Sequence, residues 1–137
     1  MQQPWMLISK TFYFNAGHRL KDHSGICRNV HGHNYKCIVN FRANEWKDTW
    51  MWVDFKDMSA IGQWLNNHFD HAFLYQKGDH IGAYLRDEWL KVYEFDLPPS
   101  TEVLAEHIYQ QSLQKGFPVY SVELRETAKC CAIYIGK

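Results

Sequence analysis

The chain has 137 residues, enough to bury one hydrophobic core but not to split comfortably into two, so we expect a single domain over residues 1–137. Lys plus Arg balance Asp plus Glu at 15 each, which leaves no net charge to draw the protein to nucleic acid or to an anionic membrane. Partners held by long-range electrostatics are therefore excluded, and any ligand must be inferred from a specific site.

The cysteines and the apolar stretches indicate the compartment. Two of the four cysteines are the adjacent Cys130 and Cys131, which we expect to be structural. The first residues do not resemble a signal peptide, and the apolar stretches are too short to span a bilayer. These features predict a cytoplasmic protein with reduced thiols. The 16% aromatic content favours self-association, because a small monomer covers so many bulky side chains poorly.

The first third of the chain predicts two strands. Residues 6–16 are rich in β-branched and aromatic side chains, and apolar and polar residues alternate toward the end of this stretch. Residues 31–43 show a similar alternation, and residues 19–30 between them have the composition of a loop. We expect the two strands to pair antiparallel across this loop.

Two helices are predicted from their capping residues. Asp54 is a suitable N-cap for a helix with apolar side chains at helical spacing that ends near Asp70. The segment 98–102, Pro-Pro-Ser-Thr-Glu, combines a hydroxyl cap with an acidic first turn, and it starts a second helix that Gly116 ends.

The remaining chain predicts short strands. They are Trp50–Val53, Val92–Phe95, Tyr120–Arg125 and Ala132–Ile135, the last two joined by a turn near Ala128 and Lys129. Residues 75–90 have no clear periodicity and stay unassigned. The order of elements predicts an α+β fold in which helices pack against an antiparallel sheet.

Three histidines form the strongest chemical signal. His31 and His33 are two residues apart, so on a strand their rings point to the same face. His18 ends the preceding strand, and antiparallel pairing would return it close to His31. Three neutral nitrogens without a fourth evident ligand suit a catalytic zinc ion with an open position. The alternative is three unrelated polar residues at a strand edge.

Cys27 lies four residues before His31, where a cation and imidazoles would lower its pKa toward the thiolate. It is then either a fourth zinc ligand or a reactive base. Cys37, by contrast, shares the alternating apolar face of the second strand and is expected in the core.

Two further features carry carboxylates. In Asp70-His71 the carboxylate could orient the ring in a proton relay, although an Asp-His pair at a helix end is more often a C-terminal cap. Glu126 ends a predicted strand, where its carboxylate could accept paired hydrogen bonds from a ring such as an amino-pyrimidinone. Its alternative is an ordinary solvated strand end.

Six short motifs occur in order along nearly the whole chain. They are Phe14-x-Ala16-x-His18, Cys27-x-x-x-His31-Gly32-His33, Trp52-Val53-Asp54-Phe55, Asp70-His71-x-x-Leu74, Ser100-Thr101-Glu102-x-Leu104-Ala105 and Glu126-Thr127. Their combination and spacing resemble the 6-pyruvoyltetrahydropterin synthase family, and specifically its 6-carboxy-5,6,7,8-tetrahydropterin synthase branch. The three-residue spacer between Cys27 and His31 is similar to that branch, whereas pyruvoyl enzymes more often have a longer spacer.

The resemblance implies a tunnelling fold, in which two helices pack on one face of an antiparallel sheet. It also implies a barrel-like homo-oligomer, usually a hexamer of two stacked trimers, with active sites between subunits. It implies that His18, His31 and His33 hold zinc, which binds the side-chain oxygens of 7,8-dihydroneopterin triphosphate and makes neighbouring C–H protons more acidic. Cys27 would move a proton together with Asp70 and His71, and Glu126 would anchor the pterin. The implied products are 6-carboxytetrahydropterin, acetaldehyde and triphosphate, at an early step toward 7-deazaguanines such as queuosine.

Two alternatives to this function stay open. One is the pyruvoyl-type reaction on the same substrate, which keeps the side-chain carbons. The other is a non-catalytic binding module that zinc stabilises, with Cys27 as fourth ligand. Lys21, Arg28 and Lys36 are candidates, by position only, for contacts with the triphosphate. Residues 75–97 are richer in charged and aromatic side chains than the resemblance leads us to expect.

Overall fold

The computed structural model describes residues 6–43 and 54–136. Six strands form one sheet: β1 (Met6–His18), β2 (His31–Ala43), β3 (Ala72–Gln76), β4 (Val92–Phe95), β5 (Val119–Arg125) and β6 (Cys131–Ile135). The helices in these residues are α1 (Phe55–His68), α2 (His80–Asp87) and α3 (Thr101–Gln114), and a 3-10 turn spans Ile26–Arg28. The strand predicted over Trp50–Val53 lies outside the described residues.

The long hairpin of β1 and β2 is the centre of the sheet, whose strand order is β4-β3-β1-β2-β5-β6. The predicted antiparallel pairing is confirmed, with a register that runs from Met6 opposite Ala43 to His18 opposite His31. β5 and β6 extend the sheet antiparallel on the β2 side. The two ends of the loop over residues 19–30 therefore lie beside each other.

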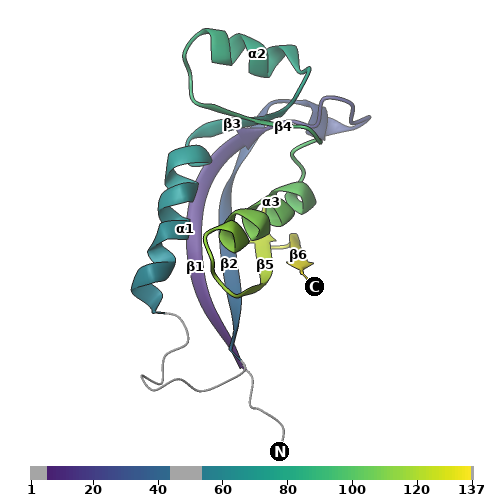
Figure 1. Ribbon diagram of the computed structural model, residues 1–137. Coiled ribbons are helices and arrows are strands. Elements are labelled where there is room, and N and C mark those ends of the chain that lie inside the picture. The colour runs from purple at the N-terminus through teal and green to yellow at the C-terminus, as the bar shows by residue number, and fades with distance from the viewer. Residues whose placement is uncertain (1–5, 44–53, 137) are drawn as a thin grey trace, which may run out of the picture.

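The prediction of a wholly antiparallel sheet is wrong in one part, because β3 runs parallel to β1 and β4 runs parallel to β3. Each parallel step follows a helix, α1 before β3 and α2 between β3 and β4 (Figure 1). α2 is a crossover helix that returns the chain to the end of the sheet at which β3 began, so β4 runs in the same direction as β3. α1 instead follows β2, and β3 runs opposite to β2 and therefore parallel to β1. The sheet is mixed, and the fold class remains α+β.

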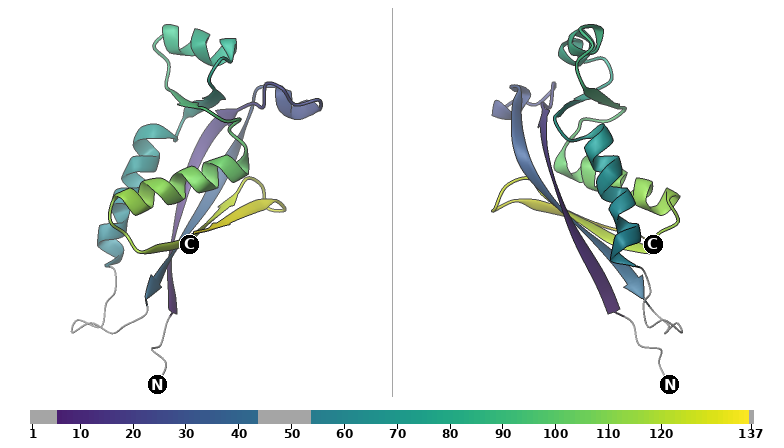
Figure 2. Two further views of the ribbon diagram at one scale, coloured as in Figure 1. Left: turned by 45° about the vertical axis from the view of Figure 1, so that its right-hand side comes forward. Right: turned by 90° about the vertical axis from the view of Figure 1, so that its left-hand side faces the viewer.

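Helices α1 and α3 lie on one side of the sheet, as predicted, and no helix of residues 6–43 and 54–136 covers the opposite side (Figure 2). Asp54 caps α1 by accepting from the Lys56 amide, and Ser100 caps α3 by accepting from the Val103 amide. Asp54 is the cap predicted from the sequence, and Ser100 is one of the two hydroxyl residues in the segment predicted to start the second helix. Gly116 follows α3 with φ of +88°, a conformation that glycine adopts at little cost.

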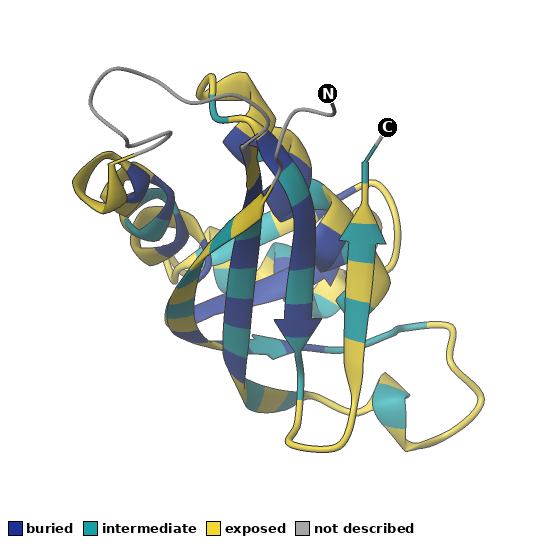
Figure 3. Cartoon of the chain, turned by 90° about the horizontal axis from the view of Figure 1, so that it is seen from below, coloured by how far each residue is buried: buried dark blue, intermediate teal, exposed yellow. Residues whose placement is uncertain are grey.

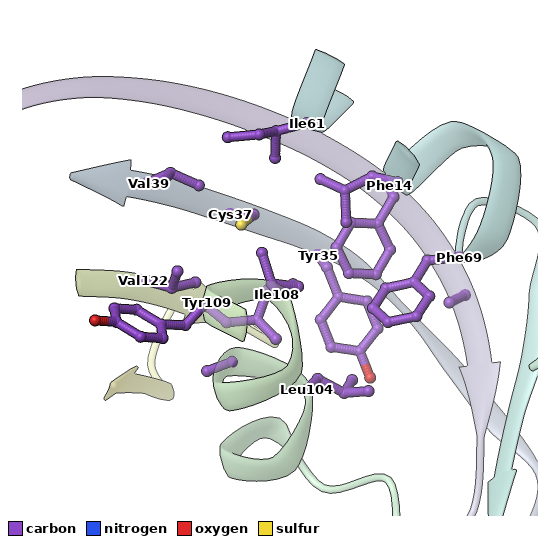
Figure 4. Close-up of a cluster of buried hydrophobic side chains, with 14 of the residues drawn as sticks. Phe14, Tyr35, Cys37, Val39, Ile61, Phe69, Leu104, Ile108, Tyr109 and Val122 are labelled. Carbon is purple, nitrogen blue, oxygen red and sulfur yellow. The ribbon is translucent and has the colours of Figure 1, made fainter. Parts of the chain in front are cut away.

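The core lies between the sheet and these two helices. Phe14 and Tyr35 stack across the hairpin with their ring centroids 4.9 Å apart, and Phe69 and Leu104 pack beside them from the helix side (Figure 4). Alternate residues of the long strands are buried, as the colour bands of Figure 3 show. Cys37 is fully buried among them, as predicted, and burial raises the pKa of its thiol to about 12.

Helix α2 occupies the segment that has no readable periodicity, and it stands beyond the end of the main helical layer (Figure 1). Asp79 caps it by accepting from the Ile81 amide. Gly82 brings the helix against the Tyr75 ring so closely that an added Cβ would lie 2.1 Å from ring atoms. None of the helices in the described ranges is long and apolar enough to cross a membrane.

Candidate active site

The hairpin register brings three histidines together at one end of the sheet. His18 is the last residue of β1 and pairs with His31, the first residue of β2, while His33 follows on the same face of β2. One potential ligand atom from each residue lies within 4.8 Å of the other two. Within residues 6–43 and 54–136 this group contains the three histidines and no Cys27 sulfur.

Backbone carbonyls orient two of these rings. His18 Nδ1–H donates to the carbonyl of Pro99 at 2.8 Å, and His31 Nδ1–H donates to the carbonyl of Asn29 at 2.7 Å. A ring that donates from Nδ1 keeps the lone pair of Nε2 free for a metal. The buried His33 Nε2 has no hydrogen-bond partner among the described residues. This donor set fits a zinc ion bound by three imidazoles.

Burial keeps two of these rings neutral near neutral pH. Desolvation lowers the pKa of His18, which is 2% exposed, and the neighbouring His31 and His33 rings act in the same direction. Desolvation also lowers the pKa of His33, partly opposed by the Glu126 carboxylate. Because only a neutral imidazole binds a metal, the site favours the metal-binding form of its own ligands.

Cys27 lies on the 3-10 turn of the loop over residues 19–30, and its carbonyl accepts from the Leu20 amide at 2.9 Å. The residue lines two cavities at the histidine cluster. One, of about 200 Å³, includes His18, Thr101 and Glu126, and the other, of about 420 Å³, includes His31, His33 and Glu126. The structure therefore places a half-buried thiol beside the three histidines.

Glu126 follows β5 directly, and its carboxylate enters the same space. Its Oε1 lies 3.2 Å from His33 Nε2, and its Oε2 lies 4.0 Å from His18 Nε2. Thr101 Oγ1 donates to Glu126 Oε2 at 2.5 Å. Thr101 was not among the predicted site residues. The signal that could have found it is the hydroxyl pair Ser100-Thr101, which occurs both at the predicted helix start and in one of the six motifs; of the two hydroxyls, that of Ser100 is the cap.

Asp70 and His71 lie outside the cavities that border the histidine cluster. Asp70 Oδ1 accepts from the Asn15 amide and Asp70 Oδ2 accepts from His71 Nδ1–H, each at 2.8 Å. The His71 side chain is 75% exposed and borders a cavity of about 440 Å³ that Asn15, Gly17 and Phe73 also line. Neither cavity at the histidine cluster includes Asp70 or His71. Within the described residues, one chain does not bring this pair to Cys27.

The Asp70 carboxylate and the His71 ring form a hydrogen-bonded pair just beyond the C-cap of α1. The C-cap of α1 is Phe69, whose amide donates to the Leu65 carbonyl. The hydrogen bond from the Asn15 amide lowers the pKa of Asp70, and the nearby His71 and Lys91 act the same way. An ionised Asp70 therefore orients the exposed ring of His71.

The three basic residues named as candidate contacts for a triphosphate differ in their pairing, their exposure and the face of the sheet on which they lie. Lys21 pairs with the neighbouring Asp22 at 2.8 Å, and Arg28 is exposed on the 3-10 turn. Lys36 alternates with the buried Tyr35 and Cys37, which places it on the face of the sheet away from the histidines of its own chain.

The sequence and the fold both match known proteins. A family model described as 6-pyruvoyl tetrahydropterin synthase matches residues 7–137. The 6-carboxy-5,6,7,8-tetrahydropterin synthase of Rickettsia conorii is 31% identical over 127 residues, covering 85% of this chain and 91% of the relative. The protein of the same name from a Synechocystis species is also 31% identical, over 134 residues that cover 93% and 92% of the two chains.

Two solved structures resemble the chain over nearly its whole length. An uncharacterised protein from Wolinella succinogenes has a TM-score of 0.81 at 20% identity, covering 98% of this chain and 99% of its own. The 6-pyruvoyl tetrahydropterin synthase of Caenorhabditis elegans has a TM-score of 0.73 at 22% identity, covering 100% and 99%. At these identities the likeness shows the fold alone, and it confirms the predicted tunnelling-fold class.

Proposed function

This chain belongs to the 6-pyruvoyl tetrahydropterin synthase family, and we propose that it is a lyase of the 6-carboxytetrahydropterin synthase type. It converts 7,8-dihydroneopterin triphosphate to 6-carboxy-5,6,7,8-tetrahydropterin and releases acetaldehyde and triphosphate. The names of relatives at about 30% identity support this branch. The observation that carries the proposal is the common space at which three histidines, a half-buried thiol and a hydroxyl-bonded carboxylate meet.

His18, His31 and His33 would hold the metal, for which zinc fits best because imidazole is its common ligand in open, three-residue sites. When bound there, zinc polarises the oxygens of the substrate side chain, so that adjacent C–H bonds lose protons more readily. The carbonyls of Pro99 and Asn29 fix the two rings that they contact. The ligand set is therefore oriented by the protein rather than by the metal alone.

The remaining side chains bind the ring and move protons. Glu126 would accept two hydrogen bonds from the N–H groups of the pterin, with Thr101 holding the carboxylate in place. Cys27 would act as the base, because it lies beside the substrate space and outside the group of ligand atoms. Asp70 and His71 would complete the proton relay.

Within one chain, Asp70 and His71 do not line the cavities that Cys27 lines. This separation supports an assembly in which a neighbouring copy of the chain completes each site. In this proposal His71 of one subunit reaches the Cys27 side of another, and its 75% exposure in a single chain leaves the ring accessible for that contact. A hexamer of two stacked trimers is the arrangement we propose. The reduced state of Cys27 that the chemistry needs agrees with a cytoplasmic location, and the product with an early step of queuosine biosynthesis.

The test is incubation of the purified protein with 7,8-dihydroneopterin triphosphate and zinc, followed by mass analysis of the products. We expect 6-carboxytetrahydropterin together with acetaldehyde and triphosphate. A pyruvoyl product without acetaldehyde would move the protein to the other reaction of the family. If no product forms and zinc removal unfolds the chain, the protein is a zinc-stabilised binding module instead.

A further inference from the structure

The turn that presents His71 has a strained backbone. His71 has φ of +61°, a left-handed conformation that residues with a Cβ rarely adopt. It lies two residues beyond Phe69, the C-cap of α1, in the turn that leads into β3. A histidine persists in such a conformation only when the surrounding structure holds it there.

Asn15 of β1 provides part of that support. Its amide donates to Asp70 Oδ1 at 2.8 Å, and its carbonyl accepts from the His71 amide at 2.6 Å. Both bonds fix the turn against the sheet on one side. They leave the last carbonyls of α1, which point along the helix axis, without a partner from β1.

Lys91 provides the other part. Its Nζ donates to the carbonyl of Asn66 at 2.7 Å and to the carbonyl of Asp70 at 2.5 Å, so that one ammonium group joins the last turn of α1 to the peptide bond that precedes His71. The Lys91 carbonyl accepts from the Phe73 amide at 3.1 Å, which fixes the lysine backbone on the far side of the turn. A cation at this end of a helix also interacts favourably with the helix dipole.

The segment around α2 delivers Lys91 to this position. After α2 the chain reverses through Trp89, whose φ is also +61°, and the amides of Trp89 and Leu90 donate to carbonyls of α2 at 3.0 Å. Lys91 follows at once and leads into β4. This places the segment that connects β3 and β4 in contact with the proposed relay.

We infer that Lys91 is a positioning residue of the proposed reaction, which holds the end of α1 in the one conformation that presents His71 to the substrate. The inference rests on the proposed role of Asp70 and His71. Lys91 acts through the turn that it holds and does not touch the substrate. Its side chain is exposed, so its removal opens no cavity in the core.

The test compares Lys91→Met, which keeps the alkyl stem and removes the donors, with Lys91→Arg, which keeps a cation and N–H donors. Lys115→Met is the matched control, since Lys115 is an exposed lysine at the end of α3, away from both groups of site residues. We expect Lys91→Met to lower kcat roughly ten- to a hundredfold, with KM and zinc content close to wild type, because His71 is displaced while the binding site is intact. Lys91→Arg should recover most of the loss.

Two readouts need no turnover. In the metal-free protein, the His71 amide should exchange with solvent faster in Lys91→Met than in wild type and Lys115→Met. The pKa of the Asp70 carboxyl should also be higher in Lys91→Met than in wild type. The Asn15 amide and His71 still stabilise the carboxylate in this variant, but the cation of Lys91 is lost. Both changes should be small in Lys91→Arg.

The outcomes separate this inference from the proposed function. If wild type is active and Lys91→Met keeps its kcat, the positioning role is wrong while the function stands. If Lys91→Met and Lys91→Arg lose activity equally, in parallel with a fall in Tm, the lysine is only structural and the inference is likewise overturned. If wild type turns over no pterin, the proposed function fails, and unchanged exchange at the His71 amide would then also reject the positioning role.

Discussion

At the scale of single residues, the three histidines differ in how they are held. His18 is buried and fixed by a carbonyl 81 positions away in the sequence, whereas His31 is fixed by Asn29 within its own loop. The buried His33 Nε2 makes no hydrogen bond among the described residues, and it lies 3.2 Å from Glu126 Oε1. A metal ion would give this nitrogen the kind of partner that buried polar atoms normally have.

We predict that His31→Ala loses the metal, because two imidazoles leave an incomplete ligand set. Zinc affinity should fall by more than roughly a hundredfold, because loss of a group that only supports a ligand already costs up to about that much, and His31 is a ligand itself. Metal analysis and competition with a chelator measure this. His23→Ala is the control, since His23 is an exposed histidine of the preceding loop whose ring accepts from the Gly25 amide. Stoichiometric, tightly bound zinc in His31→Ala would overturn the ligand assignment.

For Cys27 we predict that the Ala variant keeps fold and zinc but loses turnover. The three histidine ligands remain, while removal of a general base costs roughly 10²- to 10⁴-fold in kcat. Zinc content, Tm and kcat of the same preparation decide the point. Cys131→Ala, at an exposed thiol of β6, should behave as wild type. If Cys27→Ala turns over normally, the base lies elsewhere, and if it loses zinc, the thiol is a ligand.

At the scale of secondary-structure elements, the sequence predicts those strands and helices that are determined by residues close together in the chain. The alternation in β1 and β2 and the caps at Asp54 and Ser100 depend on neighbouring residues, and these elements are found where expected. The continuous burial of β3 has no alternation to detect, since its first four residues are buried on both faces. Helix α2 has only eight residues, and Gly82 interrupts its pattern.

The contrast between local and long-range interactions also explains which parts of the candidate site can be predicted from the sequence. The pair His31 and His33 follows from strand geometry, and His18 follows from the hairpin, so their convergence could be expected from the sequence. The support from Pro99, Thr101 and Lys91 could not, because each is distant in the sequence from the residue that it holds. A backbone carbonyl, moreover, leaves no signal in residue type.

The contact between β4 and α3 gives a prediction about pH. Tyr93 Oη and His107 Nε2 lie 2.7 Å apart in a hydrogen bond, inside an aromatic cluster that also contains Trp64 and Phe69. Burial lowers the pKa of His107, with Glu106 opposing the shift and His68 reinforcing it. The folded protein therefore binds fewer protons at this ring than the unfolded chain does.

The stabilising contribution of neutral His107 is complete above the unfolded value of about 6.5 and declines as the pH falls below it. We predict that the free energy of unfolding falls less between about pH 7.5 and about pH 5.5 in His107→Gln than in wild type. Urea denaturation at both pH values, with zinc at the same level in both proteins, measures the difference. An equal fall in the two proteins would show that His107 does not contribute.

At the scale of the whole molecule, the described residues leave one face and two edges of the sheet open. The described helices cover one side of the sheet (Figure 2), and β4 and β6 form its edges. β6 carries the exposed Ile133 and Ile135 along one such edge. Exposed strand edges with apolar side chains pair readily with another chain. This arrangement agrees with an assembly in which the relay of one subunit serves the site of another.

An exchange of subunits tests this arrangement directly. Cys27→Ala and His71→Ala should each be inactive alone, since each variant removes one member of every relay. In mixed assemblies produced by co-expression, we predict that roughly one quarter of the sites combine Cys27 of one chain with His71 of its neighbour and regain turnover. Activity per zinc atom, compared with wild type, gives this fraction.

The control mixture is Cys27→Ala with His31→Ala. Both residues line one cavity of a single chain, so no combination of subunits restores a complete site. Recovery in the first mixture but not in the second requires sites shared between chains, and no recovery in either would place the whole relay within one chain.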